Sequence, residues 1–532
     1  MKKTIILFFT ALFVFTSCTQ KEEELNVLTI LKVTNISFDS IQVVIGINES
    51  LTLTLKQTPA NLPAPLLTWV SLSPDIATVD ANGVVKGVSI GIAKIKVSNQ
   101  SDQSISSTCN VIVKIRGTSE LPYLIYTVQD LIQMRDRLNN DNSNYGNKVY
   151  KLMSDLDFSN EASWLPIGNS DTTPFTGIFD GNNKIIKKIR IGTQNSSVSL
   201  TNAGLFGKVS GGDIRNLSVQ WTNLSSTNGN AGGIIGLLLG GTITNCNSSG
   251  NIINSYSIAG GIVGSASNST ITNCYSTGNI TSQSTSGGIA GTLSSGTVNN
   301  CYATGDITTS DGPCAGGIGG SSSDCCIINS YSTGIISSTS SSSTFGSYYY
   351  CLSGGISGSG GCIINCYSTG NINCSSIYVY PSSGGIAGAA NGSIINCYTT
   401  SNINSTSTNG YTSLSGGIAG CHSNVMNCIA LNSSIVSISN NDSYACRIGC
   451  FLNATSSNNY AASTIILKKG TSSNNLTNVT SFTNAITDGV SLKSNPVDLL
   501  NAYVTANPTV NGVSLSKWKV DPSINNGNPI FQ

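Results

Sequence analysis

The stretch Gly260–Ser286, GGIVGSASNSTITNCYSTGNITSQSTS, is followed directly by a close copy of itself, GGIAGTLSSGTVNNCYATGDITTSDGPCA, which runs from Gly287 to Ala315. Each copy opens with two small residues and an Ile, and the second of the small residues recurs at Gly233, Gly261, Gly288, Gly317, Gly355, Gly385 and Gly417. A second anchor, Asn-Cys-Tyr or a close variant, begins at Asn245, Asn273, Asn300, Asn329, Asn365, Asn396 and Asn427. Self-similarity at this period predicts one supersecondary unit stacked many times into a long, rigid solenoid.

The alternation of side chains within one repeat predicts which residues point inward. In the stretch 273–280, one face carries Cys274, Ser276, Gly278 and Ile280, and the other carries Tyr275, Thr277 and Asn279. The small and apolar face belongs inside a narrow right-handed parallel β-helix. We therefore expect an interior column of buried, reduced cysteines at Cys246, Cys274, Cys301, Cys366, Cys397 and Cys428. The same register predicts an outer strip of tyrosines at Tyr275, Tyr302, Tyr331, Tyr367 and Tyr398.

The composition indicates an all-β, extracellular protein. Only 10% of the residues are charged, 39% are hydrophobic and 56 are glycine, while helix-forming residues are scarce. A net charge of +1 gives no electrostatic basis for binding nucleic acid. At 532 residues, the chain is expected to form more than one domain.

Residues 1–18 have the pattern of an export signal: Lys2 and Lys3, then an apolar stretch from Ile5 to Phe15, then Cys18 after small residues. The segment resembles the signal peptide of a bacterial lipoprotein, which implies lipidation of Cys18 and an anchor in the outer membrane. Residues 19–26 form an acidic tether that resembles the surface-export tag of Bacteroidetes lipoproteins and implies exposure at the cell surface. Cleavage to a plain secreted protein, or a tether without a targeting role, are the alternatives.

Residues 27–116 show short alternating strands separated by turns, as in a β-sandwich. Thr68-Trp69-x-Ser71, Asp75-Ile76-Ala77-Thr78-Val79-Asp80 and Asn82-Gly83-Val84-Val85-x-Gly87 follow one another in an order that resembles the group 2 bacterial Ig-like family. The resemblance implies an N-terminal Ig-like spacer or adhesive module. We expect Trp69 in its core, a tight turn at Asn82-Gly83, and a buried free thiol at Cys109.

The rest of the chain divides into three predicted parts. Residues 118–220 form an N-terminal cap and the first coils, with a capping box at Thr127–Asp130 that opens a short helix. Residues 221–452 carry the repeats, and residues 453–532 form a C-terminal cap. The GGI-x-G blocks resemble the GLUG-motif repeats of bacterial surface proteins over roughly Tyr123 to Tyr460.

Three insertions mark a candidate binding surface. The connections from Gly334 to Gly354, from Gly370 to Gly384 and from Ser401 to Gly416 are longer than the others and leave the same corner of consecutive coils. Insertions on one face of a solenoid often form its binding face. These three carry Phe345, Tyr348, Tyr349, Tyr350, Tyr378, Tyr380 and Tyr411. We expect either an aromatic patch that binds a glycan or a host or matrix protein, or loops that only cover the side of the helix.

The charged residues argue against an enzyme. Between Ala231 and Tyr460 they are Asp306, Asp311, Asp324, Asp442 and Arg447. Glycoside hydrolysis needs two neighbouring carboxylates. Asp306 and Asp311 share one repeat, where we expect solvated loop carboxylates, with a weak shared cation as the alternative, and the other charged residues fall in separate coils. With His422 as the only histidine and no CxxC spacing, we expect no metal, no cofactor and no catalytic residues. The sequence therefore predicts an adhesin or ligand-binding display rod on the cell surface. A structural surface component without a specific ligand is the first alternative, and a carbohydrate-active β-helix enzyme is the second.

Overall fold

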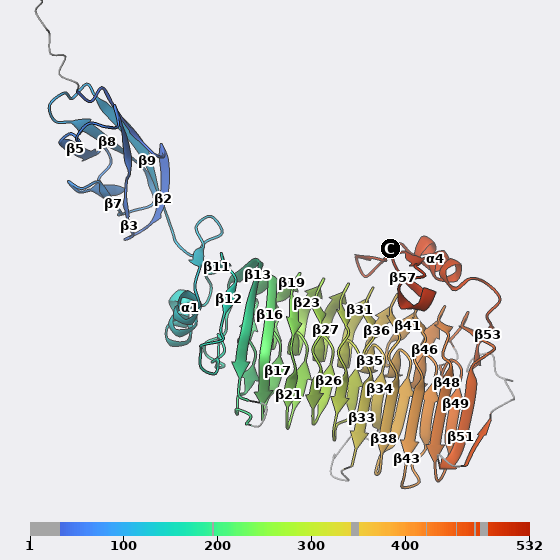
Figure 1. The fold of residues 1–532 in the computed structure, drawn as a ribbon. Helices are drawn as coiled ribbons and strands as arrows, with labels where there is room; N and C mark the ends of the chain where they lie inside the picture. Colours follow the sequence, from blue (N-terminus) through green and yellow to red (C-terminus); the bar gives the residue numbers. More distant parts are fainter. Residues whose placement is uncertain are drawn as a thin grey trace, which may run out of the picture. The chain divides into compact units, whose positions relative to one another are not determined.

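A computed structural model of the 532-residue chain describes residues 32–193, 196–341, 350–421, 423–453, 455–472, 475–478 and 488–532 (Figure 1). The chain separates into two compact units, one that ends at Ile115 and one that spans Arg116–Gln532. Among the described residues, no helix has the length and apolar character that a membrane crossing requires.

The first unit is an Ig-like β-sandwich. One sheet has the strand order β2-β9-β8-β5, the other has the order β3-β7-β6, and β1 pairs with β4. Its strands are β1 (Asn35–Phe38), β2 (Gln42–Gly46), β3 (Ser50–Thr52), β4 (Leu55–Thr58), β5 (Leu67–Ser71), β6 (Ala77–Val79), β7 (Val84–Gly87), β8 (Gly91–Asn99) and β9 (Ser106–Lys114). Alternate residues of β8 and β9, such as Ile95 and Val111, are fully buried between the sheets.

The details of the sandwich follow the sequence in most places. Gly83 closes the β6–β7 turn with a φ of +78°, and Asp80 accepts hydrogen bonds from the backbone of Asn82 and Val84. Cys109 is a buried free thiol, and burial raises its pKa. Trp69 is only half-buried: it packs at the edge of the core against Phe38, with ring centroids 5.8 Å apart.

The second unit opens with the predicted capping box. Thr127 accepts from the Asp130 backbone and Asp130 accepts from the Thr127 backbone, which starts α1 (Val128–Asn140). Leu131, Met134 and Leu138 of this helix are buried against the first strands. The remaining elements of the cap and the first coils are α2 (Asn142–Tyr145), β10 (Tyr123–Ile125), β11 (Val149–Leu152), β12 (Leu156–Asp157), β13 (Ile178–Ile191) and β16 (Asp213–Ser226).

Beyond the cap the chain is a parallel β-helix, in which every coil pairs with the next through parallel strands (Figure 1). One side is a nine-stranded sheet made of β14 (Asn202–Ala203), β17 (Asn230–Gly232), β22 (Ile258–Gly260), β26 (Thr285–Gly287), β30 (Cys314–Gly316), β34 (Tyr350–Gly354), β39 (Tyr380–Gly384), β44 (Ser413–Gly416) and β49 (Ser443–Cys446). In the seven strands from β17 to β44 the last residue is the first Gly of the GGI anchor, and the rest of the anchor turns the chain toward the next side of the coil.

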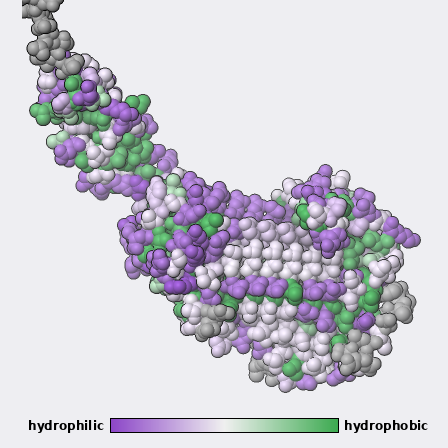
Figure 2. All heavy atoms as spheres, in the orientation of Figure 1, coloured by the Kyte–Doolittle hydropathy of each residue, from purple (hydrophilic) through white to green (hydrophobic). Residues whose placement is uncertain are grey.

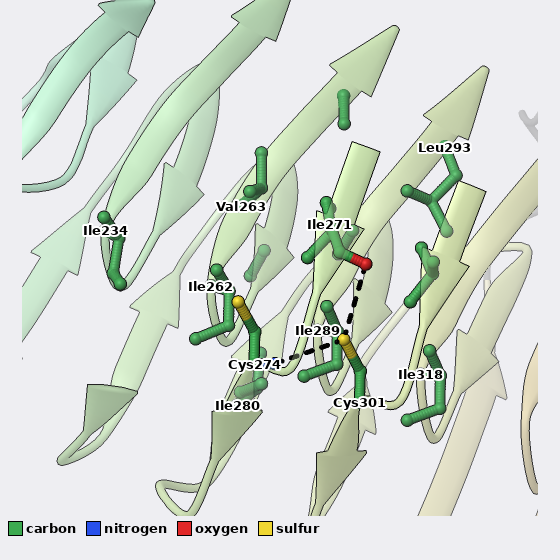
Figure 3. Packing of buried hydrophobic residues seen from close by; sticks show 14 of the residues in the cluster. Ile234, Ile262, Val263, Ile271, Cys274, Ile280, Ile289, Leu293, Cys301 and Ile318 are labelled. Carbon is green, nitrogen blue, oxygen red and sulfur yellow. Dashed lines mark hydrogen bonds between the residues drawn. The ribbon is translucent and has the colours of Figure 1, made fainter. Parts of the chain in front are cut away.

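The strands after that turn form the second side. They are β15 (Phe206–Ser210), β18 (Ile235–Leu239), β19 (Thr242–Thr244), β23 (Val263–Thr272), β27 (Ala290–Asn299), β31 (Gly319–Ile328), β35 (Ser357–Ser359), β36 (Cys362–Ile364), β40 (Ala387–Ala389), β41 (Ser393–Ile395), β45 (Ala419–Cys421) and β46 (Asn424–Met426). The Ile of each anchor points inward, and Figure 3 shows Ile234, Ile262, Ile289 and Ile318 in one row. These four side chains have no exposed surface, so the anchor supplies a continuous apolar core.

Two further columns complete each coil. The tyrosine column consists of β20 (Asn247–Ser249), β24 (Tyr275–Ser276), β28 (Tyr302–Ala303), β32 (Tyr331–Ser332), β37 (Tyr367–Ser368), β42 (Tyr398–Thr399), β47 (Ile429–Ala430) and β50 (Tyr460–Ala461). The last column consists of β21 (Ile252–Asn254), β25 (Ile280–Ser282), β29 (Ile307–Thr309), β33 (Ile336–Ser340), β38 (Ile372–Ser376), β43 (Ile403–Ser407), β48 (Ser434–Ser439) and β51 (Ile466–Ser472). Because β50 and β51 still pair in parallel with β47 and β48, the β-helix continues past the predicted boundary at residue 452.

The interior cysteine column is confirmed. All six predicted cysteines are buried free thiols. In the coil between Cys301 and Cys366, the buried Ser330 occupies the corresponding position of the column. Each thiol donates to a backbone carbonyl two residues earlier, as Cys301 does to Asn299 at 3.3 Å. Cys301 also accepts from the backbone N–H of Cys274 at 3.4 Å (Figure 3). The thiols therefore satisfy backbone groups at the corner of each coil.

An asparagine ladder runs beside the cysteines. The Asn of every Asn-Cys-Tyr anchor has a φ between 49° and 56°, a left-handed conformation that asparagine tolerates better than most residues. Its side-chain amide donates to the equivalent Asn of the preceding coil, as Asn300 does to Asn273 at 2.7 Å and Asn396 to Asn365 at 2.8 Å, except that Asn329 donates to Asn299. The recurring Asn is thus required by the corner of the coil.

The C-terminal segment packs along the side of the β-helix. After the short strand β53 (Val490–Ser491), α4 (Pro496–Ala506), β54 (Thr509–Val510), β55 (Val513–Ser514), β56 (Trp518–Val520), η1 (Asn525–Gly527) and β57 (Pro529–Phe531) follow. Leu500, Val504 and Trp518 form one buried cluster with Tyr367 and Tyr398. The β-helix edge itself is continued by β52 (Asn475–Asn478), which pairs antiparallel with β51.

The tyrosine strip is a stacked ladder, half of which is covered by this segment. Neighbouring rings from Tyr275 to Tyr367 are 4.8, 4.9 and 4.8 Å apart and within 5° of parallel. Tyr331 and Tyr367 also contact Phe531. Tyr275 and Tyr302 remain half-exposed.

Covering the ladder makes the stability of the β-helix sensitive to alkali. Burial, together with the neighbouring Tyr302, raises the pKa of Tyr331 to about 12. Because the folded pKa lies above the ordinary value of about 10, the stabilisation is complete below pH 10 and is lost as the pH rises through 12. We expect the unfolding free energy to fall across this window in step with tyrosinate absorbance. Burial also raises the pKa of Tyr367 and Tyr398, so Tyr331→Phe should make that dependence shallower without abolishing it. An unchanged profile in this variant would contradict the assignment.

Candidate functional site: a tyrosine ridge

Three of the predicted aromatic residues form a continuous ridge along successive coils. Tyr350 and Tyr380 occupy the first positions of β34 and β39, are register partners, and have ring centroids 5.6 Å apart. Tyr411, two residues before β44, packs its ring edge against Tyr380 at 5.3 Å. All three side chains are half-buried. We call Tyr350, Tyr380 and Tyr411 the tyrosine ridge.

The ridge exists because the three insertions rejoin the nine-stranded sheet at equivalent positions of successive coils. Leu352, Ser382 and Leu414 are register partners in the nine-stranded sheet, so the residues just before them lie on neighbouring coils. Adjacent parallel strands are ~4.8 Å apart, which suits ring-to-ring contact. Insertions of different lengths therefore present their last tyrosine at a common edge.

A small apolar cluster supports the ridge. Leu414, Cys421 and Cys450 are buried together, and Tyr350 packs against them. Burial raises the pKa of Tyr350 and of the Cys421 thiol, the latter to about 11, so both groups are neutral at physiological pH. The ridge thus has an uncharged, partly apolar floor.

The other predicted residues fall into two groups. Tyr378 lies two residues before Tyr380, and its side chain is 40% exposed. Phe345, Tyr348 and Tyr349 lie outside the described residues, as do Cys18 and His422.

A polar hollow adjoins the end of the ridge, and the sequence did not reveal it. A cavity of about 350 Å³ is lined by Asp442, Ser443, Tyr444 and Lys469 among others. Ser439, also in its wall, donates to the backbone carbonyl of Tyr411 at 2.6 Å, which joins the hollow to the ridge. Asp442 looked isolated in sequence and Lys469 lay in the predicted cap. Only the continuation of the β-helix past residue 452 brings them together.

Two further acidic residues of the repeats, Asp306 and Asp311, hold the backbone of the next coil. Asp306 accepts from the backbone N–H of Ile335 at 2.9 Å, and Asp311 accepts from that of Ser341 at 2.9 Å. Within the described ranges, no group of three or more His, Cys, Asp or Glu side chains is placed to hold a metal ion. What the ridge and hollow offer chemically is therefore aromatic surface, hydroxyl groups, and one charge of each sign.

The fold and site define a β-solenoid repeat protein preceded by an Ig-like module, and comparisons with known proteins identify the parts. Residues 32–111 belong to the bacterial Ig-like domain (group 2) family. Residues 227–253 and 255–281 are GLUG motifs. The geometry of these two repeats continues through the coils on either side of them.

Two further similarities are to individual proteins. Halomucin of Haloquadratum walsbyi (strain DSM 16790 / HBSQ001) is 32% identical over 148 residues, which are 26% of this chain and 2% of halomucin. This chain therefore matches only a small part of that protein. The crystal structure of a proposed immunoglobulin A1 protease from Bacteroides ovatus matches with a TM-score of 0.36 and 21% identity, over 78% of this chain and 94% of the other.

Proposed function

We propose that this protein is a non-enzymatic adhesin that binds an extended glycan along the tyrosine ridge. In this proposal Cys18 is lipidated, the outer membrane holds the protein, the Ig-like module acts as a spacer, and the β-helix displays the binding surface outside the cell. The observation that carries the proposal is the unbroken contact of Tyr350, Tyr380 and Tyr411 over three coils.

The chemistry of the surface suits a carbohydrate. Ligand sites combine aromatic surface with a few polar groups that set orientation. Sugar rings present an apolar C–H face that packs on aromatic rings and hydroxyl groups that need hydrogen-bond partners. The ridge supplies the first, and the hollow with Asp442, Ser443 and Lys469 supplies the second. The coil spacing of ~4.8 Å is comparable to one pyranose unit of an extended polysaccharide.

The face of the β-helix in view supports a display role over a catalytic one. Figure 2 shows a surface mostly of intermediate hydropathy. A mostly hydrophilic stripe crosses it, running from one coil to the next along the length of the β-helix. Asp306 belongs to such an outward column, where it accepts from the Ile335 backbone and its own backbone donates to Asn279. Hydrogen bonds of this kind hold neighbouring coils together, as a display rod requires.

The test is binding of the chain from residue 27 to an array of glycans and matrix proteins, with Tyr380→Ala as the decisive variant. Tyr380 contacts both other ridge residues, so its removal breaks the platform. We expect Kd for the bound glycan to rise about tenfold or more, since a central aromatic contributes ~2 kcal/mol at such surfaces.

Matched variants make the test specific. Tyr256→Ala removes a tyrosine that is 69% exposed on an earlier coil and should leave Kd unchanged. Tyr302→Ala tests the uncovered part of the tyrosine ladder. A folded protein that binds nothing on the array would favour the structural surface component. Binding that survives Tyr380→Ala would place the site elsewhere.

A further inference from the structure

Four of the cysteines outside the interior column come together in two pairs near the tyrosine ridge. The sequence could not assign partners to these cysteines. The structure places Cys351 against Cys374 and Cys446 against Cys450. Cys351 directly follows the ridge residue Tyr350, and Cys450 belongs to the apolar cluster that supports it.

The first pair bridges the two walls of the β-helix. Cys351 lies in β34 of the nine-stranded sheet, and Cys374 lies in β38 of the facing sheet. The Cys374 thiol donates to the Cys351 sulfur at 2.9 Å and is also 2.9 Å from the Cys351 carbonyl oxygen. Both residues are at least 98% buried, so the contact crosses the interior of the coil.

The second pair closes a short loop at the end of the ridge. Cys446 is the last residue of β49, and its sulfur is 2.8 Å from that of Cys450. Cys450 is buried, whereas Cys446 is partly exposed. A disulfide requires a sulfur separation of about 2.05 Å, so in both pairs the sulfur atoms need to approach by less than about 1 Å.

The column cysteines are arranged differently. Their thiols donate to carbonyl oxygens and accept backbone N–H groups of the adjacent coil, as Cys397 does from Cys366 at 3.4 Å and to Ile395 at 3.2 Å. A bond between two of them would break those contacts and join corresponding residues at the corners of adjacent coils. The two classes of cysteine are therefore distinct in geometry.

We propose that Cys351–Cys374 and Cys446–Cys450 are disulfide-forming pairs, while the column cysteines remain thiols. The first pair fastens the ridge strand β34 to β38, and the second closes the loop that follows β49. This inference rests on the proposed export, because disulfides form in oxidising compartments. For each bond, one thiolate attacks an incoming disulfide of a protein or small-molecule oxidant. The second thiolate then attacks the mixed disulfide. Each pair loses two protons and two electrons, and the oxidant leaves as two thiols.

Burial determines when each pair is oxidised and which of the two disulfides is reduced first. Desolvation raises the pKa of Cys374 and Cys450, so these thiols are poor nucleophiles once the coil has closed. The interior pair is therefore oxidised before folding is complete. The pair with the partly exposed Cys446 remains accessible in the folded protein, so a mild reductant opens that bond first.

Peptide mapping without reduction tests the proposal. The full-length protein isolated from cells is denatured with N-ethylmaleimide present, then digested with chymotrypsin or trypsin. Chymotrypsin cuts after Tyr367, between Cys351 and Cys374, and trypsin cuts after Arg447, between Cys446 and Cys450. We expect two linked peptide pairs, each lighter than its reduced form by two hydrogens, and alkylated Cys301 and Cys397.

Two variants and a refolding experiment with the reduced chain distinguish the proposed pairing from the alternatives. Cys374→Ser should abolish the first link and expose Cys351 to alkylation. The control Cys301→Ser, which copies the natural Ser330, should change neither link. In parallel, the reduced chain is refolded with oxidised and reduced glutathione. Links in this arm but not in cells would refute export and uphold the pairing. Alkylation of all four paired cysteines in both arms, or links among column cysteines, would overturn the proposal.

Discussion

Gly288→Ala is expected to destabilise the β-helix by about 3 kcal/mol, at the upper end of the cost of overpacking. A methyl group at this position would lie 2.0 Å from the Gly317 carbonyl oxygen and 2.4 Å from the Cβ of Ala303. Neither atom can rotate away, since one belongs to the backbone of the next coil and the other to a buried strand. The substitution therefore has to separate two coils.

The measurement is denaturant unfolding of the β-helix followed by circular dichroism. Gly240→Asn is a matched control: no atom lies within 4 Å of its Cβ position, and its φ is +65°. The corresponding residue of the next coil is Asn268, with a φ of 50°. This control should change stability by less than about 1 kcal/mol, because asparagine tolerates the left-handed region. Equal midpoints for the two variants would refute the close-stacking explanation of the GGI anchor.

Asn365→Ala is expected to cost about 4 kcal/mol, because four partners, three of them buried, lose their hydrogen bonds at once. The Asn365 amide donates to Asn329 at 2.8 Å and to the Ser516 carbonyl at 2.9 Å. Its oxygen accepts from Asn396 at 2.8 Å and from the Trp518 indole at 2.7 Å. The side chain is fully buried, so water does not replace these contacts.

Two readouts separate this effect from general destabilisation. Trp518 is held between the exposed residues Lys517 and Lys519, so release of the C-terminal segment should speed tryptic cleavage there. Asn273→Ala removes an exposed member of the same ladder, with a φ of 54° and bonds to Asn245 and Asn300. It should cost roughly 1–2 kcal/mol and leave that cleavage rate unchanged. Equal cleavage in both variants would show that Asn365 does not hold the segment.

The repeat was sufficient to predict the fold class, because its period and alternation are local properties of the chain. The inward positions of Cys274 and Ile280 and the outward position of Tyr275 follow from a side-chain period of two. The capping box at Thr127 is equally local. The extent of the β-helix past residue 452 was missed, since β50 and β51 keep the parallel pairing after the sequence motif has faded.

The candidate site was predicted only in part. Tyr350, Tyr380 and Tyr411 could be placed on one edge because their insertions leave equivalent corners. The hollow with Asp442 and Lys469 could not, because these residues are 27 positions apart and meet only through the last coils.

The sequence by itself determined the stacked architecture, the Ig-like module and the composition of each column, because these depend on periodic patterns of small, apolar and polar residues. The tertiary structure alone decided which cysteines pair and where the C-terminal segment lies. Trp518 reaches Tyr398 and Asn365, more than a hundred residues away along the chain. Contacts of this kind depend on how a non-repeating segment folds back on the coils, and no local pattern encodes them.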